Sequence, residues 1–215
     1  MAPFSFIELL KKQFLLPLPG SEAQQKMAPH GRKSFNCSDF SVLNSKKGSI
    51  LIAIYPHNNL WLTAYIKRTE YTGVHSGQIS FPGGKFEPRD ISAENTALRE
   101  TYEEIGVFPE EVEIIGQLSD LYIPASNFIV TPFVGFIPIR PQFKIQEKEV
   151  AALIEVELNT ILKASENVAT TKIRTVSDRV ITAPVYQFEQ HLIWGATAMI
   201  TSEFIELVKM TGMKL

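Results

Sequence analysis

Cysteine is nearly absent from the sequence. Cys37 is the single cysteine among 215 residues, so an intrachain disulfide framework is excluded. We interpret Cys37 as a small, partly buried apolar residue. A domain without disulfides depends on its hydrophobic core. Hydrophobic residues make up 45% of the chain, which is enough to build a sizeable core.

Long apolar runs and targeting signals are absent as well. No run reaches the roughly 18 apolar residues that a membrane-spanning helix needs. The N-terminus has no basic segment followed by a long apolar stretch, so we expect no secretory signal peptide. These absences predict a cytoplasmic protein without a membrane partner.

Neither sign of charge dominates the sequence. It has 21 lysines and arginines against 23 aspartates and glutamates, a formal net charge of -2. Nucleic-acid binding depends on many basic residues that neutralise phosphates, so this balance predicts no nucleic-acid partner. The length suits one domain with additions. We divide the chain into an N-terminal helix and loop extension, residues 1–35, and a main domain, residues 36–215.

Two amphipathic helices are predicted near the ends of the chain. In each, apolar residues recur at the spacing that places them on one helical face. Prolines at positions 17 and 19 end the first helix, because proline cannot continue a helical hydrogen-bond pattern. The residues that share a face are Phe4, Ile7, Leu10 and Phe14 in the first helix, and Ile200, Phe204, Leu207 and Val208 in the last.

Between these helices, β-rich apolar runs alternate with turn signals. Asn58 and Asn59 separate the first two runs and indicate a hairpin. Pro132 lies inside a later run and predicts a sheet edge or a bulge, because it has no N–H to donate. Strands on both sides of one central helix, followed by a terminal helix, predict an α+β domain. The predicted strands lie at residues 49–55, 60–67, 112–118, 128–139, within 149–158, and over 179–188 as a strand pair or one bent strand.

The central helix belongs to the stretch around which we expect the chain to be organised, residues 81–107. Ser92 is a suitable N-cap residue and Gly106 a suitable C′ residue. Leu98, Tyr102 and Ile105 fall at helical spacing on one face, with Ala97 beside them.

Three glutamates crowd another face of the same helix. Glu100, Glu103 and Glu104 stand at i, i+3 and i+4, where each like-charge pair costs about 0.2–0.5 kcal/mol. They also lie in the C-terminal half, where the helix dipole favours cations. A solvated acidic face is one interpretation. A divalent cation such as Mg²⁺ or Mn²⁺ is the other, because it binds carboxylate oxygens. The preceding Gly83 and Gly84 favour the second, since glycine lets a ligand approach the backbone closely.

This stretch resembles the Nudix box, written G-x5-E-x7-R-E-U-x-E-E-x-G-U with U apolar. It departs from the box in three ways: Asp90 replaces the first glutamate, the gap to Arg99 is one residue longer, and Thr101 stands at an aliphatic position. The resemblance implies a Nudix hydrolase domain over residues 36–215, with an α/β/α sandwich around a mixed sheet. The positions that match are Gly84, Arg99, Glu100, Glu103, Glu104, Gly106 and Val107.

The resemblance also implies metal-dependent hydrolysis of a diphosphate linkage, with Mg²⁺ or Mn²⁺ as the cofactor. Glu100 and Glu104 are the first candidates for metal ligands, and the carbonyl of Gly84 is a further one. Glu103 is a third ligand or the general base. We expect Arg99 to orient a glutamate rather than to contact the substrate. Glu149 is an alternative base outside the box.

The segment upstream of the box is similar to the signature of the coenzyme A pyrophosphatase-like branch of this family. Arg68, Gly77 and residues 81–84 fit that signature, whereas Gly73 stands where the branch has arginine. Three further segments also resemble this branch, namely LPLPG, NFIVTPFVGFI and HLIWGATAMI. The substrate-binding candidates are Arg68, His75, Lys85, Gly83 and Gly84.

Three functions remain open at this point. The first is hydrolysis of coenzyme A, or a derivative, to 4′-phosphopantetheine and adenosine 3′,5′-bisphosphate. The second is a pyrophosphatase for another nucleoside diphosphate derivative, such as ADP-ribose or a dinucleotide, and Gly73 keeps this possibility open. The third is a non-catalytic ligand sensor, which the intact set of three glutamates disfavours. The expected partner is a small nucleotide substrate, and a homodimer is left open as the assembly.

Overall fold

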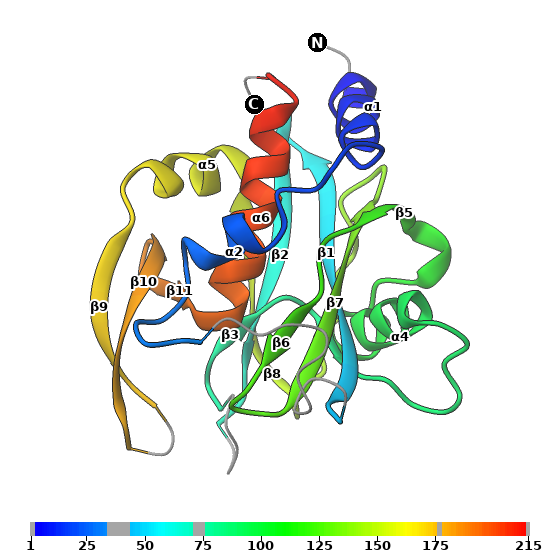
Figure 1. Cartoon of the computed structure of the whole chain (residues 1–215). Coiled ribbons are helices and arrows are strands. Elements are labelled where there is room, and N and C mark those ends of the chain that lie inside the picture. Colours follow the sequence, from blue (N-terminus) through cyan, green and yellow to red (C-terminus); the bar gives the residue numbers. More distant parts are fainter. Residues whose placement is uncertain (1–2, 34–43, 71–75, 176–177, 214–215) are drawn as a thin grey trace.

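A computed structural model describes residues 3–33, 44–70, 76–175 and 178–213. Its main feature is an eight-stranded mixed sheet with helices on both faces, and a three-stranded sheet lies beside it (Figure 1). The α+β prediction and the α/β/α sandwich are therefore confirmed. Cys37, Gly73, His75 and the predicted boundary after residue 35 all lie outside the described residues.

The main sheet begins with the predicted hairpin. Strands β1 (Lys46–His57) and β2 (Leu60–Arg68) pair antiparallel. Asn58 and Asn59 form the turn with φ angles of 49° and 63°, a left-handed conformation that asparagine tolerates well. The other strands of this sheet are β3 (Ile79–Ser80), β4 (Gly83–Lys85), β5 (Glu113–Gln117), β6 (Leu121–Ile123), β7 (Phe128–Phe136) and β8 (Val150–Glu157).

Strand β7 corrects one of the two alternatives predicted for Pro132, because this residue is not at a sheet edge. β7 runs parallel to β1 on one side and pairs with both β5 and β6 on the other. Pro132 lies where the pairing with β5 ends and that with β6 begins, and its carbonyl accepts a hydrogen bond from the Leu118 N–H at 2.9 Å. The break between these two short partners accommodates a residue without an N–H.

Alternating residues of β1 face two different layers. Leu51, Ala53 and Tyr55 pack with helix α4 (Ala93–Ile105), whereas Ile52 and Ile54 belong to the larger core on the other face. This alternation is the normal geometry of a strand buried on both sides. The larger core is covered by α1 (Pro3–Gln13), α2 (Gly20–Gln25), α5 (Leu158–Glu166) and α6 (Gly195–Met210).

The small sheet lies on the same side of the main sheet as α6, opposite to α4 (Figure 1). Its strands are β9 (Ala169–Arg174), β10 (Val180–Phe188) and β11 (His191–Trp194), and β10 is the central one. The predicted segment 179–188 therefore forms one strand rather than a strand pair. Residues 109–111 add a single 3₁₀ turn after α4.

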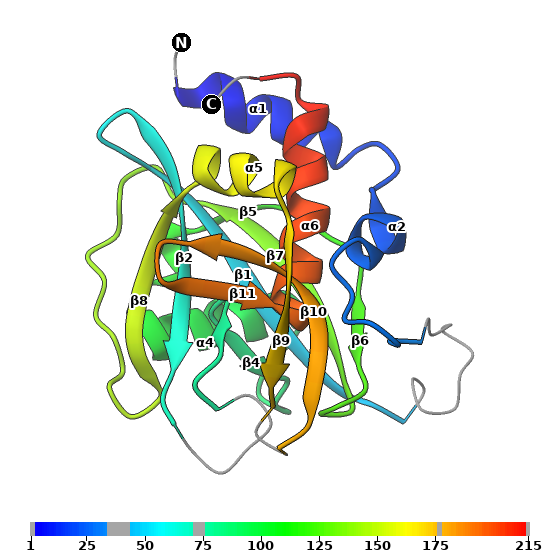
Figure 2. The ribbon, with the colours of Figure 1, turned by 90° about the vertical axis from the view of Figure 1, so that its left-hand side faces the viewer.

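The N-terminal segment packs into the same core as the rest of the chain. Phe6, Ile7 and Leu10 of α1 are fully buried among residues of α6 and the sheet. The start of α1 and the end of α6 lie at the same end of the molecule (Figure 2). Glu203 of α6, fully buried, accepts a hydrogen bond from the backbone N–H of Gly20 at 3.2 Å. In the part of the chain that the structure describes, no helix has the length and apolarity needed to cross a bilayer.

Candidate active site

Helix α4 begins and ends as predicted. The Ser92 side-chain oxygen accepts a hydrogen bond from the Asn95 N–H at 3.1 Å, and Gly106 closes the helix with φ 75°. The apolar face identified in the sequence is not buried throughout, because Tyr102 is 44% exposed, whereas Thr101 is buried. Thr101 donates a hydrogen bond to the Ala97 carbonyl at 2.7 Å. This bond gives the buried Thr101 hydroxyl a hydrogen-bond partner, so a threonine can occupy the position where the family has an aliphatic residue.

The two glycines before the helix hold the backbone against its carboxylates. Gly83 has φ 147°, and a Cβ there would lie 2.3 Å from the carbonyl oxygen of Ser49, so β4 can pass β1 only with glycine at this position. The Gly83 N–H donates to Glu104 Oε2 at 2.8 Å. A Cβ on Gly84 would lie 2.4–2.6 Å from the carboxylate of Glu100.

Arg99 forms hydrogen bonds with the acidic groups of this site, and its orienting role stays a prediction. Its Nε and Nη2 donate to the two oxygens of Asp90 at 2.8 and 2.9 Å. Its Nη1 donates to Glu100 at 2.9 Å and to Glu103 at 3.0 Å. The Asp90 side chain is buried, and the hydrogen bonds from Arg99 are the main reason why its pKa is held well below the usual range. Asp90, which aligns with the first glutamate of the box, is thus bound by Arg99 through both carboxylate oxygens.

Replacing Asp90 with asparagine should lower the free energy of unfolding by about 1.5–3 kcal/mol near pH 7, because a charged acceptor of the Arg99 guanidinium is lost. The pKa of Asp90 is depressed in the fold, so its contribution is present above its ordinary pKa of 3.8 and is lost as the pH falls below that value. Urea unfolding of both proteins near pH 7 and near pH 2 tests this. The difference in the free energy of unfolding between the wild type and the variant should shrink at the lower pH. Equal stability of the two proteins near pH 7 would show that the Asp90–Arg99 pair contributes nothing.

Glu104 is the most deeply buried carboxylate of the site, with a side chain only 2% exposed. Burial raises its pKa to about 7, and the charges of Glu100 and Glu149 act in the same direction. Arg68 and the Gly83 N–H oppose this rise, and Arg68 Nη1 lies 3.4 Å from Glu104 Oε1. Glu104 thus joins the box helix, the glycine turn and strand β2.

Glu100 has a raised pKa as well, first because of burial, with Glu103 and Glu149 adding to the effect and Arg99 opposing it. Glu149 therefore acts electrostatically on both Glu100 and Glu104, although it lies far from them in the sequence. The structure brings the predicted alternative base close to the box glutamates. Carboxylates whose charges raise the pKa of Glu100 and Glu104 are a favourable environment for a cation.

The chemistry of these donors fits a hard divalent cation, because carboxylate oxygens are the ligands that Mg²⁺ and Mn²⁺ prefer. Their present orientation does not form a complete ligand set. Among the described residues, no group of three or more His, Cys, Asp or Glu side chains is arranged to hold a metal ion. Glu103 instead pairs with Arg89 at 3.1 Å and with Arg99. The assignment of Glu100, Glu103, Glu104 and the Gly84 carbonyl as metal ligands stays a prediction.

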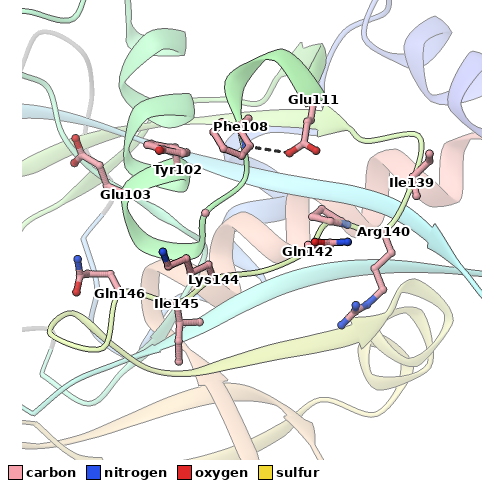
Figure 3. Close-up of a pocket in the computed structure, with 12 residues that line it drawn as sticks. Tyr102, Glu103, Phe108, Glu111, Ile139, Arg140, Gln142, Lys144, Ile145 and Gln146 are labelled. Atoms are coloured by element: carbon pink, nitrogen blue, oxygen red, sulfur yellow. Dashed lines mark hydrogen bonds between the residues drawn. The ribbon is translucent and has the colours of Figure 1, made fainter.

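A groove with a volume of about 760 Å³ lies at the C-terminal end of α4 (Figure 3). Tyr102 and Phe108 form one side of it, and Arg140 and Lys144 come from the segment that follows β7. Of the three box glutamates only Glu103 lines this groove, because Glu100 and Glu104 face the glycine turn instead. The groove is therefore distinct from the buried carboxylates.

The remaining candidates lie in different surroundings. Arg68 reaches Glu104, as described above, whereas the Lys85 side chain is exposed and its backbone carbonyl accepts a hydrogen bond from Arg99 at 3.0 Å. Trp61 is partly buried and packs against Phe6 of the core, with ring centroids 5.1 Å apart and ring planes tilted by 54°. The sequence analysis missed the contact between Arg89 and Glu103, which joins a loop to a helix and leaves no periodic signal.

Comparison with known proteins agrees with the motif. The family model described as the NUDIX domain matches residues 46–173. A Yersinia enterocolitica protein named "Uncharacterized Nudix hydrolase NudL" is 38% identical over 77% of this chain and 83% of its own length. A protein of the same name from Enterobacter sp. is 37% identical over 80% of this chain and 86% of its own. The solved structure of a MutT/nudix family protein from Enterococcus faecalis superposes with a TM-score of 0.51 at 16% identity, covering 84% of this chain and 66% of that one.

Proposed function

Because the chain belongs to the Nudix hydrolase family, we propose that it hydrolyses the diphosphate linkage of coenzyme A or a coenzyme A derivative. The products are 4′-phosphopantetheine, or its acyl form, and adenosine 3′,5′-bisphosphate. The observation that carries the proposal of diphosphate chemistry is the buried Glu104. It lies between the Gly83 N–H and the Arg68 guanidinium, and the charges of Glu100 and Glu149 act on it.

We propose Mg²⁺ or Mn²⁺ as the cofactor. Glu100 and Glu104 would hold it, with Glu103 and the Gly84 carbonyl as further ligands. A bound divalent cation neutralises the charge of a diphosphate and lowers the pKa of water.

The residues of this chain orient the reacting groups and move the proton. Water attacks one phosphorus, the bond from that phosphorus to the bridging oxygen breaks, and the other phosphate leaves. Glu149 is our candidate for accepting the proton of the attacking water, with Glu103 as the alternative. Glu104 is less suited to that task, because its two oxygens already accept hydrogen bonds from Gly83 and Arg68. Arg99 holds Glu100 in place.

The choice of coenzyme A rests on the upstream signature around Arg68. Arg68 comes from the end of β2 and its guanidinium is mostly buried beside Glu104, a position from which it can donate to a phosphate. Lys85 at the end of β4 is exposed and can add positive charge near the glycine turn. A pyrophosphatase for ADP-ribose or a dinucleotide is the second candidate, because Gly73 replaces the arginine of the branch. Membership of a hydrolase family argues against a non-catalytic sensor.

Arg68→Ala should lower kcat/KM for coenzyme A by roughly 10- to 100-fold, the effect expected when a charge-assisted hydrogen bond to a phosphate is lost. It should also move the pH profile upward, because Arg68 is the main charge that lowers the pKa of Glu104. Gly73→Arg should improve coenzyme A turnover more than ADP-ribose turnover. Steady-state assays of a substrate panel with Mg²⁺ and with Mn²⁺, repeated over a range of pH, measure all three effects.

The matched control is Arg89→Ala. It removes the same charge from an exposed residue that pairs only with Glu87 and Glu103 among the described residues, and it should leave the pH profile in place. If the wild type prefers ADP-ribose and Gly73→Arg changes neither substrate, the coenzyme A proposal is replaced by the second candidate.

A further inference from the structure

Thr69, the residue that follows Arg68 at the end of β2, uses its N–H, its carbonyl and its hydroxyl to bind other segments of the chain. Its N–H donates to the carbonyl of Glu149 at 3.0 Å, and its hydroxyl donates to the carbonyl of Lys148, also at 3.0 Å. Its own carbonyl accepts a hydrogen bond from the N–H of Gly77 at 3.2 Å. Thr69 therefore attaches the residues just before β8 to the end of β2.

The segment that Thr69 holds is attached to α4 at its other end. The N–H of Lys144 donates to the carbonyl of Ile105, and the N–H of Gln146 donates to the carbonyl of Glu104, each at 2.9 Å. Both carbonyls belong to the last turn of α4, where they have no partner inside the helix. Residues 144–149 thus form a bridge between α4 and β2, and we refer to them as the bridge segment.

The place of the Glu149 carboxylate depends on the backbone of the bridge segment. The Glu149 side chain is exposed, so packing restrains it little. Its backbone is held on both sides, because its N–H donates to the carbonyl of Gln146 at 2.9 Å and its carbonyl accepts from the N–H of Thr69. In addition to burial, the charge of Glu149 raises the pKa of both Glu100 and Glu104. The bridge segment therefore keeps this carboxylate beside the box glutamates.

The Thr69 hydroxyl is the contact of the bridge segment that a substitution can remove selectively. The other bonds described above join backbone groups, which remain when a side chain is changed. Valine keeps the β-branched shape of threonine and its conformational preference but lacks the hydroxyl. Serine keeps the hydroxyl and lacks the methyl group. Thr69→Val and Thr69→Ser therefore separate the hydrogen bond from the shape of the side chain.

We propose that Thr69 is a positioning residue for Glu149. Its hydroxyl holds the bridge segment where the Glu149 carboxylate can accept the proton of the attacking water. Thr69 itself contacts neither the substrate nor the reacting atoms. A general base must lie within about 2.6–3.2 Å of the atom whose proton it accepts, so a loosened bridge segment leaves fewer molecules with an aligned base. The inference rests on the proposed function, in which Glu149 is the candidate base, and deepens it.

A double-mutant cycle with the best diphosphate substrate of the panel tests this role. Thr69→Val should lower kcat by about 2- to 10-fold, the equivalent of one neutral hydrogen bond, with little change in KM, whereas Thr69→Ser should stay close to the wild type. In a Glu149→Gln background, Thr69→Val should cause no further loss, because no base remains to be positioned. An equal loss in both backgrounds, or a Glu149→Gln variant as active as the wild type, would overturn the inference.

Thr175→Val is the matched control. The Thr175 hydroxyl likewise donates to a backbone carbonyl, that of Arg179 at 3.1 Å, and its N–H donates to the same carbonyl at 2.8 Å. This contact lies at the end of β9 in the small sheet, away from the bridge segment. Removing the hydroxyl there should leave kcat unchanged, so a loss specific to Thr69→Val cannot come from the loss of any surface hydroxyl.

Amide hydrogen exchange of the full chain without substrate separates this inference from the proposed function. The N–H groups of Glu149 and Val150 both donate to the carbonyl of Gln146. Their exchange should be about 2- to 10-fold faster in Thr69→Val than in the wild type and unchanged in Thr69→Ser. Unchanged exchange in Thr69→Val would overturn the inference even if the chain hydrolyses diphosphates. Faster exchange in a chain that hydrolyses no diphosphate of the panel would support the anchor at Thr69 and refute the proposed function.

Discussion

Replacing Glu104 with glutamine is expected to lower kcat/KM for the diphosphate substrate by roughly 10²- to 10³-fold while the fold is kept. Glutamine has nearly the same shape and retains an oxygen that can accept the Gly83 N–H. It loses the negative charge that would bind the cation, and charge stabilisation by a metal is worth several kcal/mol in the transition state. Steady-state kinetics at saturating Mg²⁺ and circular dichroism measure the two effects. Turnover close to that of the wild type would remove Glu104 from the proposed metal site.

The same variant should change how stability depends on pH in the absence of metal. The pKa of Glu104 is raised from 4.5 to about 7 in the fold, so the protein gains stability while this group is protonated. That gain is complete below about pH 4.5 and is lost as the pH rises to about 7. The difference corresponds to about 3 kcal/mol, since one pKa unit equals about 1.4 kcal/mol. Glu104→Gln should therefore be more stable than the wild type near pH 8 and similar to it near pH 4.

Urea unfolding with a chelator present, at both pH values, measures this difference. Glu103→Gln is the matched control, because it removes the same charge from the same helix at a side chain that is 44% exposed. The control should not reproduce the effect, since an exposed carboxylate loses little hydration on folding. A wild-type stability that does not fall between these pH values would show that Glu104 is not held protonated by its surroundings.

The second large effect is expected at the glycine turn, where two adjacent residues should respond differently to alanine. At Gly84 the new methyl group would lie 2.4–2.6 Å from the Glu100 carboxylate. This carboxylate is the end of a flexible side chain, so Glu100 can turn away and the backbone need not move. Gly84→Ala should then lose roughly 10²-fold in kcat/KM, because one proposed metal ligand is displaced, with little change in the free energy of unfolding.

At Gly83 the obstacle is the backbone itself. The methyl group would lie 2.3 Å from the Ser49 carbonyl oxygen and 2.6 Å from Ile50 Cα, and φ is 147°. Gly83→Ala should therefore destabilise the protein by at least about 1–3 kcal/mol, the cost of the strained backbone conformation alone. Steady-state kinetics and urea unfolding of both variants distinguish the effect on activity expected at Gly84 from the effect on stability expected at Gly83. A folded and fully active Gly84→Ala would show that this glycine serves packing only.

Features governed by neighbouring residues could be predicted from the sequence alone. Ser92 and Gly106 marked the ends of α4, and Asn58 and Asn59 marked the hairpin, because capping and turn conformations depend on a few adjacent residues. The box pattern placed Arg99 beside the glutamates, since residues four apart on a helix are neighbours. The α+β class and the hydrolase family followed from these local signals.

Contacts between distant segments were decided only by the tertiary structure. The sequence could not place Arg68 and Glu149 around Glu104, because strand β2 and the loop before β8 approach α4 only when the sheet forms. Burial of Thr101 instead of Tyr102 depends on which side of α4 meets the sheet, and helical periodicity leaves that rotation undetermined. Pro132 is tolerated inside β7 because two short strands meet opposite it. In each case the decisive free energy comes from packing and desolvation across the fold, which no local pattern in the chain encodes.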